Sequence, residues 1–214
     1  MFYDIAKRFI DIVGAIVLII VFSPLLLLIP ILIKIDSSGP VFADIPRRVG
    51  KGGKLFRLYK FRTMIANAHY LMKTDPKFRR LYEQYKKNSY KIPWRDDPRV
   101  TRVGRFLRRF SLDELPQVFN VLKGEMSIVG PRAYYPDELE TQQKVYPESE
   151  KHIKELLKVK PGITGYWQVH GRSEINFDKR VRMDAYYARQ RSILQDIIIL
   201  LKTPWVMISG KGAL

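Results

Sequence analysis

The stretch FIDIVGAIVLIIVFSPLLLLIPILI, residues 9–33, decides how this chain can fold, because Asp11 is its only charged residue. As one helix it would reach roughly 37 Å, enough to cross a hydrocarbon core of about 30 Å with some tilt. A cleaved signal peptide matches poorly, because the run is too long and no small-residue cleavage site follows it. The sequence therefore predicts an N-terminal helix embedded in a membrane.

Two features favour a re-entrant hairpin over a simple spanning helix. Pro24 follows Ser23 inside the run, where proline removes a backbone hydrogen bond and clashes with the preceding turn, so we expect a break. Basic residues, which favour the cytoplasmic side of a membrane, flank both ends of the run: Lys7, Arg8, Lys34, Arg47, Arg48, Lys51 and Lys54. A helix–break–helix hairpin would place both flanks on one side. The alternative is a spanning helix that tolerates its proline.

The composition of the 214 residues excludes several classes of protein. A formal net charge of +17 calls for an acidic partner, either nucleic acid, anionic lipid or a phosphorylated substrate. The absence of cysteine excludes disulfides and thiol catalysis. The histidines at 69, 152 and 170 lack metal-ligand spacing, so no zinc site is expected. Glycine-rich dinucleotide, P-loop and nucleophile-elbow motifs are also missing.

After Pro40 the pattern predicts a change from membrane helix to a small β-hairpin. Short strands are expected at 41–42 and 55–61, joined by a glycine-rich turn at 50–53. We expect an α+β fold with two parts: a membrane segment at 1–35, and a compact, helix-rich domain at 36–214.

Two further segments are predicted to be helical. Residues 66–90 are polar with one packing stripe, and a loop is expected at 91–98, where prolines interrupt the pattern. Residues 193–208 are apolar but broken by Asp196 and Pro204. That segment fits either an interfacial amphipathic helix or a buried core helix.

The residues with the clearest chemical potential are the pair Asp113-Glu114, which several arginines surround. Ser111 and Glu114 form a capping-box pattern, which predicts a helix beginning here. A helix N-terminus attracts phosphate, and a carboxylate among arginines would be ionised and available as a nucleophile at phosphorus. An anionic nucleophile that approaches a diphosphate needs charge neutralisation, and arginines with magnesium would supply it.

A series of short motifs runs along the chain: Ser23-Pro24, Lys60-Phe61-Arg62-Thr63-Met64, Asp97-Pro98-Arg99, 111–117, 120–127, 129–132, 161–165, 167–169 and 184–187. Each motif is weak alone, but their order and spacing together are specific. On these motifs the chain resembles, over nearly its whole length, the monotopic polyprenyl-phosphate phosphoglycosyl transferases of the bacterial sugar transferase family.

The resemblance implies a two-step transfer of a phosphosugar. Asp113 would attack the sugar-bearing phosphate of a UDP-sugar, so that UMP leaves and an aspartyl phosphosugar remains. A polyprenyl phosphate, usually undecaprenyl phosphate, would then take the phosphosugar as a lipid diphosphosugar. Glu114 is implied in magnesium binding, with Asp113 as a second candidate ligand, and in activation of the acceptor.

The same resemblance assigns the remaining site positions. Phosphate, nucleotide and other substrate contacts are implied for Lys60, Arg62, Arg108, Arg132 and Asp184, and the break of the re-entrant helix for Ser23 and Pro24. Ala133 departs from the family pattern, which has a second proline after the arginine. That departure concerns the rigidity of the loop after Arg132.

The resemblance also implies a place in the cell and a pathway type. It points to the bacterial inner (cytoplasmic) membrane, with the catalytic domain on the cytoplasmic face, and to the start of O-antigen, capsule or exopolysaccharide assembly. The family members that the chain resembles most transfer galactose 1-phosphate or glucose 1-phosphate. They often carry extra N-terminal membrane helices, so the chain is expected to be a short member or a catalytic fragment. The extra apolar surface allows a homodimer.

Three rival functions remain open from the residues. A nucleic-acid-binding protein would account for the charge but not for the apolar run, so nucleic acid is not an expected partner. A non-catalytic membrane-surface protein accounts for both features but not for Asp113-Glu114 among arginines. A glycosyltransferase that moves sugar without phosphate would release UDP instead of UMP.

Overall fold

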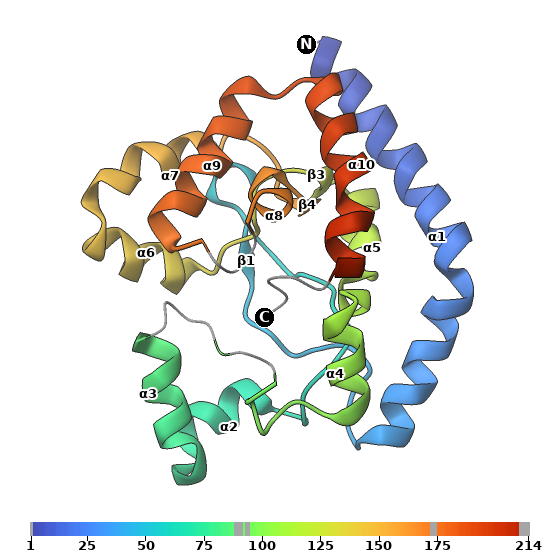
Figure 1. Ribbon diagram of the computed structural model, residues 1–214, viewed down its shortest axis with the longest axis vertical. Helices are drawn as coiled ribbons and strands as arrows, with labels where there is room; N and C mark the ends of the chain where they lie inside the picture. The colour runs from blue at the N-terminus through green and yellow to red at the C-terminus, as the bar shows by residue number, and fades with distance from the viewer. Residues whose placement is uncertain (1, 88–91, 93–94, 172–174, 210–214) are drawn as a thin grey trace.

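The computed structural model describes residues 2–87, 92, 95–171 and 175–209, which form a helix-rich α+β molecule (Figure 1). This confirms the expected mixed fold class. In chain order the elements are α1 (Phe2–Asp36), β1 (Arg48–Val49), η1 (Lys51–Gly53), β2 (Leu55–Phe56), α2 (Ala68–Thr74), η2 (Pro76–Phe78), α3 (Arg79–Lys87), α4 (Arg102–Arg109), η3 (Leu112–Glu114), α5 (Gln117–Lys123), β3 (Ser127–Val129), α6 (Pro136–Val145), η4 (Pro147–Ser149), α7 (Glu150–Leu156), β4 (Gly162–Thr164), α8 (Tyr166–Val169), α9 (Phe177–Gln190) and α10 (Ile193–Ser209).

The apolar run forms a single helix, α1, which continues through both Pro24 and Pro30. Figure 1 shows α1 bent along its length. Pro24 has no N–H to donate to the carbonyl of Ile20, and the Ser23 hydroxyl donates to that oxygen instead, at 2.8 Å. The helix therefore continues through the Ser-Pro pair, where the sequence predicted a break. A two-armed hairpin is not seen in α1, and the sidedness of its flanks stays a prediction.

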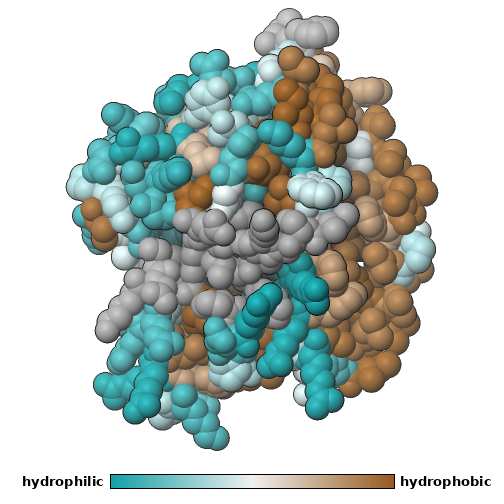
Figure 2. All heavy atoms as spheres, viewed as in Figure 1, coloured by the Kyte–Doolittle hydropathy of each residue, from teal (hydrophilic) through white to brown (hydrophobic). Residues whose placement is uncertain are grey.

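Helix α1 packs on the domain with one face and leaves the other bare. It contacts α5, α4 and β3, and Ala15, Ile29 and Ile33 are buried on its inner face. By length and composition α1 could cross a membrane. Apolar side chains on its outer face contribute to the brown band in Figure 2: Ile5, Phe9, Val13, Ile16, Val17, Ile20, Val21, Leu27, Leu28, Ile31, Leu32 and Ile35. An apolar surface of this extent marks a contact with membrane or protein and supports membrane association.

The β-structure of the described residues consists of two small sheets. Strands β1 and β2 pair antiparallel, with Val49 opposite Leu55, around the predicted glycine turn. Gly52 adopts φ 68°, which explains the need for glycine there. The first strand lies at 48–49 instead of 41–42, and Phe42 makes only an isolated bridge with Phe61. Strands β3 and β4 pair parallel, which the sequence analysis did not anticipate.

The described part of the polar segment, residues 66–87, forms the two α-helices α2 and α3 instead of the single one expected. Pro76 cannot continue the hydrogen bonds of α2, and the Asp75 carboxylate accepts from the N–H of Lys77 at 2.9 Å to begin η2. Of the predicted loop, residues 91, 93 and 94 lie outside the described part of the chain. Its second half is fixed by the ion pair of Arg99 with Asp97, at 2.7 Å.

The inner face of the C-terminal helix α10 is buried in the core, whereas an interfacial position of its outer face stays a prediction. Asp196 and Ile199 are buried, whereas Leu201 and Trp205 are strongly exposed. The Asp196 carboxylate receives a hydrogen bond from Tyr187 at 2.6 Å and lies 2.9 Å from the ammonium of Lys7. These contacts fasten α10 to α9 and to the start of α1, so the inner face of α10 belongs to the core while its outer face remains apolar and exposed.

Candidate active site

Asp113 lies in a tight connection between α4 and α5. Ser111 adopts a left-handed backbone conformation (φ 56°) and its side chain does not cap the following turn. The predicted capping box is therefore wrong. The turn η3 is closed by backbone bonds such as Glu114 N–H to the carbonyl of Ser111, at 3.2 Å. The N–H of Phe61 donates to the carbonyl of Asp113 at 2.9 Å, so the strand-like segment that contains Lys60 lies against the turn.

The side chains of Asp113, Glu114 and Lys60 form a compact cluster. The Lys60 ammonium lies 2.8 Å from Asp113 Oδ2 and 3.3 Å from Glu114 Oε1. Asp113 is 2% exposed, and Oδ2 has no hydrogen bond of good geometry among the described residues, although Lys60 is close. Burial would lower the pKa of Lys60, but Asp113 and Glu114 outweigh it and raise that pKa. The ammonium therefore stays protonated and offsets part of the negative charge of the two carboxylates.

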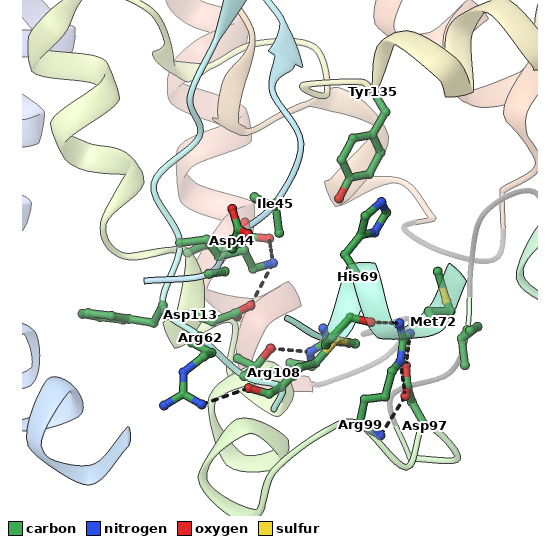
Figure 3. A pocket seen from close by; sticks show the side chains of 18 of the residues that line it. Asp44, Ile45, Arg62, His69, Met72, Asp97, Arg99, Arg108, Asp113 and Tyr135 are labelled. Carbon is green, nitrogen blue, oxygen red and sulfur yellow. Dashed lines mark hydrogen bonds and ion pairs between the residues drawn. The ribbon is translucent and has the colours of Figure 1, made fainter. Parts of the chain in front are cut away.

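This cluster opens into a pocket of about 330 Å³ whose wall is rich in guanidinium groups. Figure 3 shows Asp113 and Arg108 on one side of it and His69 and Tyr135 on another. The charged lining residues are Asp44, Arg48, Lys60, Arg62, Asp97, Arg99, Arg108, Asp113, Glu114, Arg132 and Arg180. A buried carboxylate in a cationic pocket is the arrangement needed to bring an anionic phosphate to an anionic nucleophile.

Arg108 and Arg62 both line the pocket, but they are held differently. Arg108 Nε donates to the Thr63 hydroxyl at 2.9 Å, and burial lowers the pKa of its guanidinium. Arg62 gives its donors to Ser37 and to the carbonyls of Pro40 and Met64. Arg108 is thus placed to contact a ligand. The bonds of Arg62 brace the segment after α1, and its predicted substrate contact stays a prediction.

Arg132 lies in the pocket wall, and Asp184 lies behind it. The Asp184 carboxylate accepts from the backbone N–H of Arg132 at 3.1 Å and from the Tyr134 hydroxyl at 2.8 Å. Burial raises the pKa of Asp184 to about 7. Asp184 is fully buried and is not among the residues lining the pocket, so the structure places it as a support for Arg132.

The sequence analysis missed several lining residues, notably Arg48, Arg180, Trp167 and Gln168. One signal could have found Arg180: it shares the helical face of Phe177, Val181 and Asp184, so an arginine falls on the buried side of α9. Arg48 had no comparable signal, because it stands beside the exposed Arg47 in an irregular stretch.

The donor set of the cluster suits magnesium, which prefers oxygen ligands. Asp113 and Glu114 supply carboxylates at the pocket, and the Glu114 side chain is 32% accessible. Among the described residues no group of three or more histidine, cysteine or acidic side chains could hold a metal by itself. An ion here would therefore complete its coordination with phosphate oxygens and water.

Comparisons with known proteins identify the family of the chain. The family model described as "Bacterial sugar transferase" matches residues 2–210. The undecaprenyl-phosphate galactose phosphotransferase of Salmonella typhimurium is 42% identical over 97% of this chain and 41% of its own length. An undecaprenyl-phosphate glucose phosphotransferase of Komagataeibacter xylinus is 38% identical over 92% of this chain and 35% of its own length.

A third relative is close to this chain in length. The exopolysaccharide production protein ExoY of Sinorhizobium fredii is 41% identical over 98% of this chain and 88% of its own length. By contrast, the chain spans about two fifths of the length of several other relatives, including the Salmonella protein. The match to the family model and these identities together show that the chain belongs to the bacterial sugar transferase family.

Proposed function

We propose that this protein transfers a sugar 1-phosphate from a UDP-sugar to undecaprenyl phosphate or another polyprenyl phosphate, releasing UMP. The observation that carries the proposal is the buried Asp113 carboxylate, beside Lys60 and at the wall of a pocket with several guanidinium groups. The names of relatives that act on undecaprenyl phosphate support the lipid acceptor. Galactose and glucose are the sugars to test first.

The geometry supports two successive displacements at phosphorus. In the first, a carboxylate oxygen of Asp113 bonds to the sugar-bearing phosphorus. The bond from that phosphorus to the bridging oxygen breaks, and UMP leaves with the bonding electrons. In the second, a phosphate oxygen of the lipid attacks the same phosphorus and Asp113 is regenerated. Lys60 and Arg108 lower the repulsion between anions in both steps.

Glu114 is the residue proposed to hold magnesium, with Asp113 as the second candidate. Bound there, the ion would neutralise charge on phosphate oxygens. Glu114 lies beside Lys60 with part of its carboxylate accessible, so it can also orient the incoming lipid phosphate. Loss of activity in Glu114→Gln, with retained UMP binding, is the outcome expected for this role.

The membrane arrangement is also a proposal. We place residues 1–35 in the bacterial inner membrane as a re-entrant element, with residues 36–214 on the cytoplasmic face. The exposed apolar faces of α1 and α10 support this and also allow a homodimer, which cross-linking in membranes would detect. Because the chain has no cysteine, labelling of Asp4→Cys and Lys54→Cys reports sidedness directly. Labelling from opposite sides would contradict the re-entrant arrangement.

The transfer itself is tested with the full chain in membranes or detergent. UDP-galactose or UDP-glucose, magnesium and undecaprenyl phosphate are supplied, and the released nucleotide is identified. UMP is expected; release of UDP would show that sugar moves without phosphate. Without lipid acceptor, intact-mass analysis should find a phosphosugar adduct on residue 113. Asp75→Asn, which keeps an N-capping side chain far from the chemistry, is the matched control for Asp113→Asn.

A further inference from the structure

The pocket wall contains two groups of cations that use their donors differently, named here the carboxylate end and the arginine end. At the carboxylate end, formed by Lys60, Arg108, Asp113 and Glu114, the cations already face carboxylates or the Thr63 hydroxyl. At the arginine end, formed by Arg48, Arg132 and Arg180 beside Tyr135 and Trp167, several donors have no hydrogen-bond partner in the described part of the chain: Arg48 Nε, Arg132 Nε, Arg180 Nε and Arg180 Nη1.

Burial makes these unused donors significant. Arg180 is 0% exposed and Arg48 is 7% exposed, and a buried charged donor without a partner is costly. Arg180 pairs with a single carboxylate, Glu138 Oε1 at 2.8 Å, and Arg48 donates to the carbonyl of Ala133 at 3.1 Å. Glu138 is the one carboxylate that forms a close ion pair with these three guanidinium groups in the described part of the chain, and all three line the cavity.

Aromatic rings hold these guanidinium groups by their faces. Cζ of Arg48 lies 3.2 Å from the centroid of the Tyr135 ring. Cζ of Arg132 and of Arg180 lie 5.5 and 5.7 Å from the Trp167 ring. Stacking restrains a planar guanidinium and leaves its N–H edge available, which is the edge that binds phosphate oxygens in pairs. The arginine end therefore has the chemistry of a preformed phosphate site.

The positions of the two ends indicate which end binds the lipid phosphate and which binds the UDP-sugar. Arg180 belongs to α9, which Figure 1 shows on the side of the molecule away from α1, and Arg48 belongs to β1, which lies near the middle of that view. The carboxylate end is tied to the end of α1 through Arg62 and Ser37. A lipid phosphate arriving along α1 reaches the carboxylate end first, so the arginine end is left for the water-soluble nucleotide.

We propose that Arg48 and Arg180, together with Arg132, bind the phosphate that leaves with the nucleotide, the α-phosphate of the UDP-sugar. The identity of this ligand rests on the proposed function. Asp113 acts on the sugar-bearing phosphate at one end of the pocket, while the arginine end holds the other phosphate and stabilises the negative charge that UMP carries away.

The test is binding of UMP and of uridine to the detergent-solubilised full chain, by calorimetry. The wild type should bind UMP more tightly than uridine. Arg48→Met and Arg180→Met should each weaken UMP binding by roughly tenfold or more, since each removes a charge-assisted contact, and should leave uridine binding unchanged. Arg47→Met and Arg182→Met are matched controls, because both neighbours are exposed and neither lines the pocket.

A purely structural role of Arg180 is tested separately. If Arg180 served only to pair with Glu138, the double variant Arg180→Met with Glu138→Gln would recover UMP affinity. Anion binding predicts no recovery. Arg48→Lys and Arg180→Lys keep the charge and should retain part of the affinity. If Arg180→Met fails to fold, Arg180→Lys and Arg48→Met still decide the question.

Two results would overturn the proposal: UMP affinity unchanged in both arginine variants, or equal losses in the exposed-neighbour controls. Its failure is distinguishable from failure of the proposed function. Wild-type protein that binds UMP through Arg48 and Arg180 but forms no UMP from UDP-sugar and lipid phosphate would contradict the transfer alone. Normal transfer with unchanged UMP affinity in the variants would contradict the arginine site alone.

Discussion

Two aspartates in this molecule are equally buried but differ in what surrounds them. Asp11 in α1 and Asp113 in η3 are each 2% exposed. Asp11 Oδ1 accepts from the Ser127 hydroxyl at 2.8 Å and from the N–H of Ile128 at 2.9 Å. Asp113 Oδ2 has no hydrogen bond of good geometry in the described part of the chain; it forms an ion pair with the Lys60 ammonium, and Asp113 lines a cavity.

Burial alone therefore does not identify a reactive carboxylate. A carboxylate whose acceptors are filled by fixed donors holds elements together, as Asp11 joins α1 to β3. A carboxylate that keeps an acceptor for a mobile cation, beside space for a ligand, can change partners during a reaction. Asp11 also lies near a lysine, with Lys7 Nζ 3.7 Å from Oδ1, and it also lines a cavity. Fixed hydrogen-bond donors therefore separate the structural aspartate from the candidate nucleophile.

Replacing Asp113 should give the largest effect on activity. Asp113→Asn removes the proposed nucleophile, so turnover should fall by at least roughly 10³-fold. The fold should survive, because Lys60 keeps Glu114 as a carboxylate partner. Release of nucleotide from a UDP-sugar, measured beside the thermal midpoint, checks both points. Full activity in this variant would remove Asp113 from the chemistry.

Replacing Asp11 should show the opposite pattern. Asp11→Ala leaves the Ser127 hydroxyl and the Ile128 N–H without their buried acceptor, at a cost on the order of 3 kcal/mol. Thermal unfolding in detergent should reveal the loss, while turnover per folded molecule stays near that of the wild type. Asp4→Ala is the control, because Asp4 is mostly exposed and its ion pair with Arg191 is long, at 3.5 Å. Equal midpoints for the two variants would refute the structural role of Asp11.

Lys60 tests the partner of Asp113. Lys60→Met leaves two adjacent carboxylates without their shared cation, so turnover should fall by about 100-fold and the thermal midpoint should also drop. Lys60→Arg should recover part of the activity. The exposed Lys54 provides the control in Lys54→Met. A loss of the same size in both lysine variants would mean that general surface charge, and not this ion pair, limits the reaction.

Asp184 is an intermediate case that sharpens the comparison: Oδ2 is hydrogen-bonded, whereas Oδ1 is buried without a partner in the described residues. Its folded-state pKa of about 7 lies above the ordinary value of 3.8, so the folded protein holds that proton more tightly than the unfolded chain. This stabilisation is complete below pH 4 and is lost as the pH rises through 7.

The wild type should therefore lose roughly 2 kcal/mol of stability between pH 5 and pH 8 through this group. Asp184→Asn can keep the hydrogen bonds from Tyr134 and Arg132, and should flatten that part of the pH dependence. Thermal midpoints across the range measure it. An identical pH dependence in both proteins would show that Asp184 does not titrate there.

Much of the fold could be predicted from the sequence, because local chemistry determines it. The glycine turn of the β1–β2 hairpin and the helical character of α10 follow from composition and periodicity. The predicted break at Ser23-Pro24 failed, because the Ser23 hydroxyl satisfies the carbonyl that proline leaves free. The capping box failed because Ser111 adopts a left-handed conformation, which no local pattern announced.

Only part of the candidate site could be predicted from the sequence, and the reason differs from that for the fold. Family motifs pointed to Asp113 and Glu114, but which arginines meet in one pocket depends on tertiary packing. Arg48 and Arg47 are neighbours in sequence, yet one is buried over Tyr135 and the other is exposed. Asp184 was expected at the substrate, and the structure places it behind Arg132. No linear pattern distinguishes a residue that lines a wall from one that supports it.

The bonds of Arg62 have a consequence for where the reaction takes place. Its guanidinium donates to Ser37, just past the end of α1. The residue before Arg62, Phe61, donates its backbone N–H to the carbonyl of Asp113. The membrane helix and the reactive turn are therefore connected by a short series of hydrogen bonds and not by a free linker. With α1 in the bilayer, as proposed, the Asp113 carboxylate lies at a fixed height above the lipid. A lipid carrier is therefore selected by the height at which its phosphate lies.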